Sequence, residues 1–194
     1  VAFVSTSNAN IEDTFIGMNE ARMEGGGGLY VETSTLSVHT NVLVKNNMAT
    51  SSDRGSGGGV LITGKGGPES NVRIIKVLGI PALDLTGNNA SNHGGAVSIL
   101  ENAALKATPG TFLVDEVTRS SRDYGSLSIT RGEAKRSGGA VYMEKGGLLS
   151  AKDAKFIECT AGSEGGAIAS SGTVELVASI FRENTAGSTG GAIA

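Results

Sequence analysis

The sequence contains no tryptophan, one cysteine, two histidines and three prolines among its 194 residues. A single cysteine, Cys159, cannot form a disulfide within the chain, so the cysteine count does not identify the redox compartment. The two histidines, His39 and His93, are isolated from any cluster of metal ligands, and both are expected on surface loops. No apolar run approaches the ~18 residues of a membrane span. The apolar stretch Val1 to Val4 lacks the basic region and cleavage site of a signal peptide.

An excess of charge of one sign is also missing. The formal net charge is -3 with both signs mixed along the chain, so there is no electrostatic footprint for nucleic acid or an anionic membrane. Glycine, in contrast, is abundant at 30 residues, while aromatic residues make up only 4%. Hydrophobic residues still make up 39%, and Val, Leu and Ile recur in short runs. This composition favours a folded, β-rich chain with many turns and a thin core over a disordered one.

Glycine pairs followed by a small and an aliphatic residue divide the chain into units. Their first glycines are 31, 37, 44, 27 and 25 residues apart, which is typical of repeat architectures. The paired turn glycines are Gly26, Gly27, Gly57, Gly58, Gly94, Gly95, Gly138, Gly139, Gly165, Gly166, Gly190 and Gly191.

A second mark precedes each glycine pair, usually by six residues. This marked residue is an asparagine in most units. It is Gly132 before the glycine pair 138–139, and Cys159 before the pair 165–166. Five marked positions are predicted to form a side-chain ladder at one corner: Asn19, Asn47, Asn88, Cys159 and Asn184. Each unit therefore reads as an apolar strand, a corner, a polar turn, two glycines and a small apolar strand.

The predicted fold is all-β: a right-handed, single-stranded parallel β-helix of roughly six to eight turns, occupying residues 1–194 as one domain. No segment has the 3.6-residue apolar stripe that a helical repeat needs, and the aromatic signatures of propeller blades are missing. Parallel crossover connections are nearly always right-handed. Loop insertions are predicted at 64–71 and 115–124. The long intervals 57–94 and 94–138 could each hold one turn or two, and 111–117 (TFLVDEV) reads as an extra strand that favours two turns in the second interval.

The motif GGAI at 165–168 and 190–193, GGAV at 94–97 and 138–141, and FxxN at Phe181 to Asn184 resemble the repeats of the polymorphic outer membrane proteins of chlamydiae and of related surface proteins of algae and protists. The resemblance covers about six units. It implies a pectate-lyase-like right-handed β-helix and a cell-surface or extracellular role in adhesion or structure. The strict FxxN phrase occurs once, since Cys159 replaces the asparagine of the neighbouring unit.

The sequence holds few candidates for chemistry, and no catalytic, cofactor or metal site is predicted. The stretch Gly59 to Gly66 nearly matches a phosphate-binding loop but lacks its hydroxyl residue, and the aspartates of calcium-binding β-roll repeats are out of register. Asn89 opens an N-glycosylation sequon, Asn-Ala-Ser. A mixed-charge run is a candidate surface for binding glycans, or for the carboxylate pair of a polysaccharide-degrading enzyme, although a solvated loop is the favoured interpretation: Asp115, Glu116, Arg119, Arg122 and Tyr124.

These observations favour a structural or adhesive repeat region, a stalk or filament component without catalysis. The alternative is a carbohydrate-binding or polysaccharide-degrading β-helix protein. Because the final strand pattern stops at Ala194, further repeats of the same chain or a capping partner are expected beyond it. Glycans, cell-surface proteins and other copies of the chain are the expected partners, and nucleic acid is not.

Overall fold

The computed structural model describes residues 1–4, 8–23, 25–39, 41–52, 55–64, 70–74, 83–107 and 127–194. These residues form short strands and no helix. The strands are two to five residues long, because glycines and polar or charged residues interrupt the apolar runs. Such runs are too short for a helix and sufficient for a strand.

The strands belong to four six-stranded sheets, and each sheet collects every fourth strand of the chain. Sheet A contains β1 (Ala2–Val4), β5 (Leu29–Glu32), β9 (Val60–Thr63), β13 (Val97–Ile99), β17 (Val141–Met143) and β21 (Ile168–Ser170). Sheet B contains β2 (Ala9–Ile11), β6 (Thr35–Val38), β10 (Ser70–Ile74), β14 (Ala103–Ala107), β18 (Leu148–Lys152) and β22 (Thr173–Val177). Sheet C contains β3 (Phe15–Gly17), β7 (Val42–Lys45), β11 (Leu83–Thr86), β15 (Leu127–Thr130), β19 (Lys155–Ile157) and β23 (Ile180–Arg182). Sheet D contains the two-residue strands β4 (Glu20–Ala21), β8 (Met48–Ala49), β12 (Asn89–Ala90), β16 (Glu133–Ala134), β20 (Thr160–Ala161) and β24 (Thr185–Ala186).

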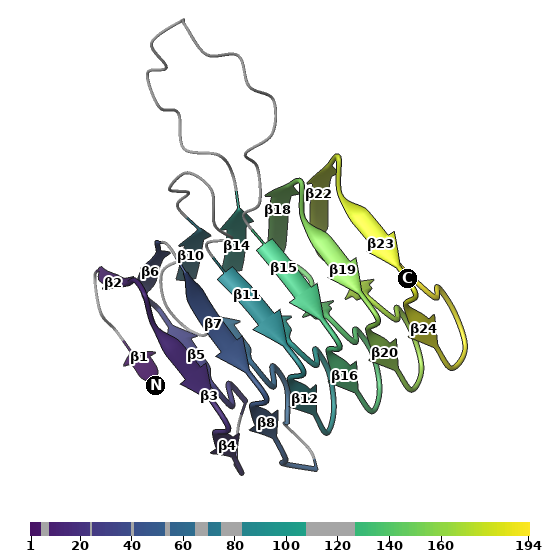
Figure 1. Ribbon diagram of the computed structural model, residues 1–194, viewed down its shortest axis with the longest axis horizontal. Coiled ribbons are helices and arrows are strands. Elements are labelled where there is room, and N and C mark those ends of the chain that lie inside the picture. Colours follow the sequence, from purple (N-terminus) through teal and green to yellow (C-terminus); the bar gives the residue numbers. More distant parts are fainter. Residues whose placement is uncertain are drawn as a thin grey trace, which may run out of the picture.

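We call one passage through sheets A, B, C and D a coil, so that β1–β4 form the first coil and β21–β24 the sixth. All neighbouring strands in a sheet are parallel. Figure 1 shows the coils side by side along the longest axis, with the two chain termini at opposite ends. This all-β stack of parallel sheets is consistent with a parallel β-helix.

The two long intervals hold one coil each. Strand β9 pairs directly with β13, and β13 pairs directly with β17 through Val97 and Val141. A second turn within 94–138 would have to stand between those partners, so the prediction of two turns there is wrong. The predicted strand 111–117 and the predicted insertion 115–124 lie outside the described residues. Of the other predicted insertion, 64–71, residues 70 and 71 belong to β10 and 65–69 lie outside the described residues.

The core consists of inward-facing rows in which each side chain lies against its counterpart in the next coil. Sheet A contributes Leu29, Val60, Val97, Val141 and Ile168, all at most 3% exposed. Sheet C contributes a row from Ile16 to Phe181, in which the rings of Phe156 and Phe181 stack 4.8 Å apart. Parallel pairing in register turns one inward residue per unit into a continuous apolar row.

The chain turns sharply between sheets, and at most of the described corners one residue adopts a positive φ. Between sheets C and D this residue directly precedes the marked ladder position: Met18, Asn46, Gly87, Arg131, Glu158 and Glu183, with φ between 52° and 63°. Most of these six residues are not glycine, although the left-handed region costs an L-residue roughly 1–2 kcal/mol. The corner geometry therefore comes from the stacked coils on either side rather than from the local sequence.

Candidate functional site

The residues marked in the sequence meet at the corner between sheets C and D, and three of them are joined by side-chain hydrogen bonds. The Asn19 amide Nδ2 donates to Asn47 Oδ1 at 2.9 Å, and Asn47 Nδ2 donates to Asn88 Oδ1 at 3.1 Å. The backbone N–H groups of Asn19 and Asn47 donate to the same oxygens. We call this set the asparagine ladder.

Each buried asparagine also satisfies a main-chain carbonyl of the preceding coil. Asn47 Nδ2 donates to the carbonyl of Ile16 at 2.9 Å, and Asn88 Nδ2 donates to that of Val44 at 2.9 Å. Both asparagines are 0% exposed. A buried amide that lost these partners would pay the desolvation cost of each unpaired group. The ladder therefore holds neighbouring coils at a fixed register.

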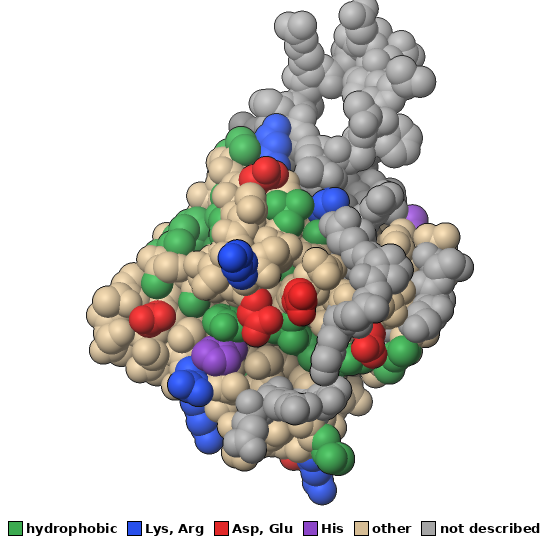
Figure 2. All heavy atoms as spheres, turned by 180° about the vertical axis from the view of Figure 1, so that it is seen from behind, with side chains coloured by type: hydrophobic (Ala, Val, Ile, Leu, Met, Phe, Trp, Pro, Cys, Tyr) green, Lys and Arg blue, Asp and Glu red, His purple; other side chains and the backbone are tan. Residues whose placement is uncertain are grey.

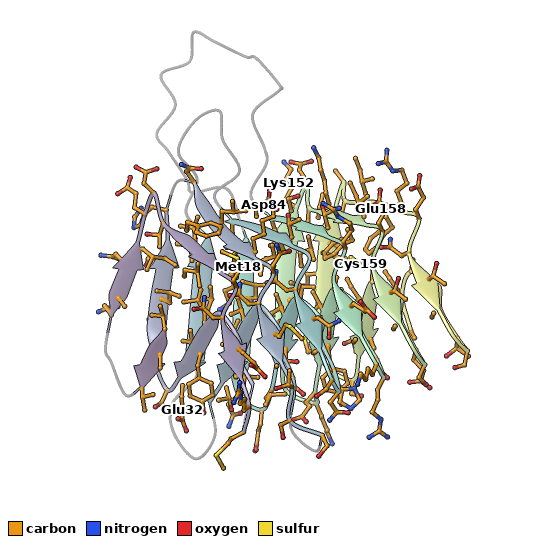
Figure 3. All side chains as sticks on the ribbon, turned by 60° about the horizontal axis from the view of Figure 1, so that its bottom comes forward. Met18, Glu32, Asp84, Lys152, Glu158 and Cys159 are labelled. Carbon is orange, nitrogen blue, oxygen red and sulfur yellow. The ribbon has the colours of Figure 1, made fainter. Side chains whose placement is uncertain are left out.

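The ladder is interrupted in the fourth and fifth coils. Gly132 has no side chain, and Cys159 points its thiol at the carbonyls of Ile157 and Ile129, with Sγ–O distances of 3.4 and 3.9 Å. The backbone N–H of Cys159 donates to Asn184 Oδ1 at 3.0 Å, so hydrogen bonding resumes toward the sixth coil. Figure 3 labels Cys159 and Glu158 at this corner of the fifth coil and Met18 at the same corner of the first.

Cys159 is a free, buried thiol. Burial is the main cause that raises the pKa of Cys159 to about 11 from an ordinary value of 9.0, although backbone hydrogen bonds oppose the shift. A thiol that stays protonated at neutral pH is a poor nucleophile and a poor metal ligand. The fold thus uses this side chain as a small packing group.

The paired glycines lie where the chain turns from sheet D into sheet A. The first glycine of each pair has φ between 58° and 74°. In every pair but the last, the second glycine has no room for a side chain: a Cβ on Gly139, for example, would lie 2.2 Å from the carbonyl oxygen of Gly166. At this corner the backbone of one coil lies directly against the backbone of the next coil, so only a residue without a Cβ fits.

An unbroken row of alanines runs along the inner side of sheet D. Its members pair in register from the first coil to the sixth: Ala21, Ala49, Ala90, Ala134, Ala161 and Ala186. The middle four are at most 2% exposed. Methyl groups leave this side of the coil narrow, which lets the glycine corners close over it.

Of the remaining candidates, Asn89 is on β12, half-buried on the outer side of sheet D between Met48 and Glu133. The hydroxyl of Ser91, the third sequon residue, donates to the carbonyl of Ser51. The predicted glycan-binding run from Asp115 to Tyr124 lies outside the described residues.

A groove that the sequence did not indicate runs over the outer face of sheet A, with a volume of about 380 Å³. Its floor is the outward row Tyr142 and Ala169, which pair in register, followed by Ala194. One wall consists of residues at the D-to-A corners of three successive coils: His93, Arg136, Ser137, Ser163 and Glu164. The other wall is formed by Ser170, the last residue of β21, and by Ser171, which follows it.

His93 closes one end of this groove by stacking on Tyr142, with ring centroids 4.2 Å apart and an interplanar angle of 22°. As expected, His93 lies on a loop, the one between β12 and β13, where it is half-buried. Its Nδ1 is buried without a hydrogen-bond partner in the described part of the chain, so stacking is what positions the ring. Burial, followed by the charge of Arg136, lowers the pKa of His93 below 6.5, and burial raises that of Tyr142 above 10.0. Both rings are therefore uncharged at neutral pH.

The face that carries sheets A and B is seen in Figure 2, where a histidine lies beside Lys or Arg side chains and most of the described surface is uncharged. The sequence could have indicated the groove only through alignment on the glycine pairs. That alignment places Tyr142 in the column of Ala169, four residues after the first glycine, and His93 directly before Gly94. The same column holds Tyr30 in the second coil but Leu61 and Ser98 in the coils between, so it has no regular aromatic pattern that sequence analysis would single out.

Comparison of the chain with models of known protein families, with curated proteins and with solved structures gave no match. Within the described ranges, no helix is long and apolar enough to cross a membrane. The same residues contain no group of three or more His, Cys, Asp or Glu side chains placed to hold a metal ion.

Proposed function

We propose that the chain is a right-handed, single-stranded parallel β-helix that serves as the structural or adhesive repeat region of a cell-surface or extracellular protein. The observation that carries this proposal is that the repeated residues all serve to stack one coil on the next. The glycines turn the chain, the alanines narrow the coil and the asparagines bond one coil to the next. Each repeated unit adds one coil to the stack and so lengthens it, and a stalk or filament requires such an elongated structure.

The resemblance to the chlamydial polymorphic outer membrane proteins supports the same role, because its GGAI and FxxN residues are those with stacking contacts here. Phe181 stacks on Phe156, and Asn184 Nδ2 donates to the carbonyl of Phe156 at 3.0 Å. Further repeats of the same chain, a capping subunit, glycans and proteins of a cell surface are the partners that this role implies.

Labelling of intact cells tests the proposed location. Antibodies raised against the 194-residue chain should label cells of the source organism without permeabilisation, and protease added outside the cells should remove the label. Label that appears only after permeabilisation would contradict a surface role.

An assay of polysaccharide cleavage tests the absence of catalysis. We expect the chain to release no reducing ends and no unsaturated products from acidic or neutral polysaccharides. A triple replacement of Asp115, Glu116 and Arg119 by alanine should change nothing. Depolymerisation that the triple replacement abolishes would instead establish a polysaccharide-degrading enzyme.

A further inference from the structure

We propose that the imidazole ring of His93 is a proton-operated cover for the ring of Tyr142: it stacks on that ring when neutral and swings off it when protonated. His93 belongs to the loop between β12 and β13, and Tyr142 points outward from β17 in the next coil. The ring centroids are 4.2 Å apart, with an interplanar angle of 22°. All groups of this device lie in coils three to five, and the inference is independent of the proposed surface role.

The backbone of the loop is tied on both sides, so that only the side chain can move. The carbonyl of His93 accepts from the N–H of Gly57 at 3.0 Å and from Ser98 Oγ at 3.2 Å. On the other side, the N–H of Gly94 donates to the carbonyl of Ser137 at 3.0 Å. The ring is held by its stack, since its buried Nδ1 has no hydrogen-bond partner among the described residues. A change of rotamer therefore releases the ring without separating the coils.

The buried Nδ1 atom makes the stack sensitive to a proton. With its proton on Nε2, the neutral imidazole leaves Nδ1 as an unpaired acceptor. The imidazolium carries an N–H at both nitrogens, so Nδ1 would become a buried, charged donor without an acceptor, which is far less favourable. A ring that swings into solvent gives this N–H to water. Because the stacking of two rings is favoured only about two- to tenfold, this gain is sufficient to reverse it.

The charges around the two rings do not compensate for the added proton. Burial, and after it the charge of Arg136, lowers the pKa of His93 below 6.5. The carboxylates Glu144 and Glu164 act on Tyr142, where burial is the main cause that raises the pKa above 10.0. Among the described residues, the charge that acts on His93 is thus of the same sign as the imidazolium.

The stack is therefore complete at neutral pH and lost in acid. The stacked ring binds a proton less readily than a released one, so the stack is favoured above pH 6.5 and is lost as the pH falls through the lowered pKa of His93. On the side of the second coil, the charged residues of the neighbouring turn are Asp53 and Arg54, which lie outside the described residues. The result of acidification is an uncovered Tyr142 ring on the outer face of sheet A.

The test is a pH titration of the isotope-labelled chain in a His39→Gln background, in which His93 is the only imidazole. Carbon shifts of the imidazole report its protonation, and NOEs between its ring protons and those of Tyr142 report the stack. We expect a protonation midpoint below 6.5 and NOEs that are present at about pH 7.5 and lost through the same midpoint. The backbone amides of the folded chain should remain dispersed throughout.

Three results would overturn the proposal. NOEs that persist after His93 is protonated would show that the imidazolium stays on the ring as a cation–π pair. A midpoint at or above 6.5 would show that the stack does not disfavour the proton. Loss of the folded amide spectrum over the same pH range would show that the coils separate, whereas the proposal requires them to stay paired while the ring moves.

Variants separate the causes of the low midpoint. Arg136→Gln should raise it by about 0.2–0.7 pH units, the effect of one exposed charge. Lys135→Gln is the matched control, because it removes the same charge from the neighbouring exposed residue and should leave the midpoint unchanged. Tyr142→Ala takes away the ring on which His93 is buried and should bring the midpoint close to 6.5. Equal shifts in the two charge variants, or no rise in Tyr142→Ala, would contradict the assignment.

Discussion

Single side chains decide how the coils are joined, and Asn47 is the clearest case. It accepts from the side chain and backbone of Asn19, and it donates to Asn88 and to the carbonyl of Ile16. All of these hydrogen bonds join Asn47 to a neighbouring coil. The side chain itself is 0% exposed, so water cannot replace a partner that is lost. A residue of this kind contributes to stability mainly because its loss would leave several buried groups unpaired.

Asn47→Ala is therefore expected to lower the free energy of unfolding by about 3 kcal/mol, since each buried group left unpaired costs about 1–3 kcal/mol. Urea denaturation followed by circular dichroism measures the change. Asn19→Ala is the matched control: the same residue type lies at the exposed first position of the ladder and should cost about 1 kcal/mol or less. Equal losses for the two variants would show that the ladder does not act as described.

Cys159 gives the chain a pH dependence of known sign. Its pKa is raised to about 11 in the folded state from an ordinary value of 9.0, so its contribution to stability is complete below pH 9 and is lost as the pH rises toward 11. The folded chain should lose about 2–3 kcal/mol over this window relative to Cys159→Ala. Urea titrations of both proteins at pH 8, 9, 10 and 11 measure the difference, and parallel curves would contradict the burial of the thiol.

At the scale of the strand and corner, the sequence predicted which residues recur in each coil. It did not predict the left-handed backbone conformation with which the corners turn. The glycine pairs and the asparagine positions are visible because they recur as residue types. The left-handed corner residues are not, because Met18, Asn46, Arg131 and Glu183 share a φ value and no chemistry. The extra turn predicted in 94–138 was wrong for a related reason. Local strand propensity does not show whether a segment pairs with other strands of the stack. The direct pairing of β13 with β17 leaves no place for another coil between them.

Gly139→Ala tests the close approach at the glycine corner. The added Cβ would lie 2.2 Å from the oxygen of Gly166 and 2.6 Å from the nitrogen of Thr160, and both are main-chain atoms that cannot rotate away. We expect a loss of about 3 kcal/mol or more, or failure to fold, because the two coils must separate. Gly146→Ala is the control, since a Cβ there meets nothing within 4 Å and carries only the strain of its φ of 87°, about 1–2 kcal/mol. Denaturation midpoints and soluble yield measure both variants.

At the scale of the whole molecule, six coils repeat one cross-section, and four parallel sheets run the length of the described stack. Each coil contacts mainly its two neighbours, so stability is expected to be close to a sum of interfaces between coils. The large exposed apolar side chains are concentrated in the first and last coils, among them Val1, Phe15, Val177, Ile180 and Ile193. Ile193 continues the inward row of Ile168, whereas Phe15, Val177 and Ile180 occupy outward positions of their sheets, in register with Leu43, Lys152 and Lys155.

The central claim, that one continuous stack of registered coils forms this chain, is tested most directly by a distance between spin labels in one row of sheet C. Lys45 and Arg182 belong to the row that passes through Thr86, Thr130 and Ile157. Labels at Lys45→Cys and Arg182→Cys, in a Cys159→Ala background, are expected to be about 19 Å apart with a narrow distribution, because four strand spacings of about 4.8 Å separate them. A broad distribution, or a mean longer by a further strand spacing, would contradict the single stack of six coils.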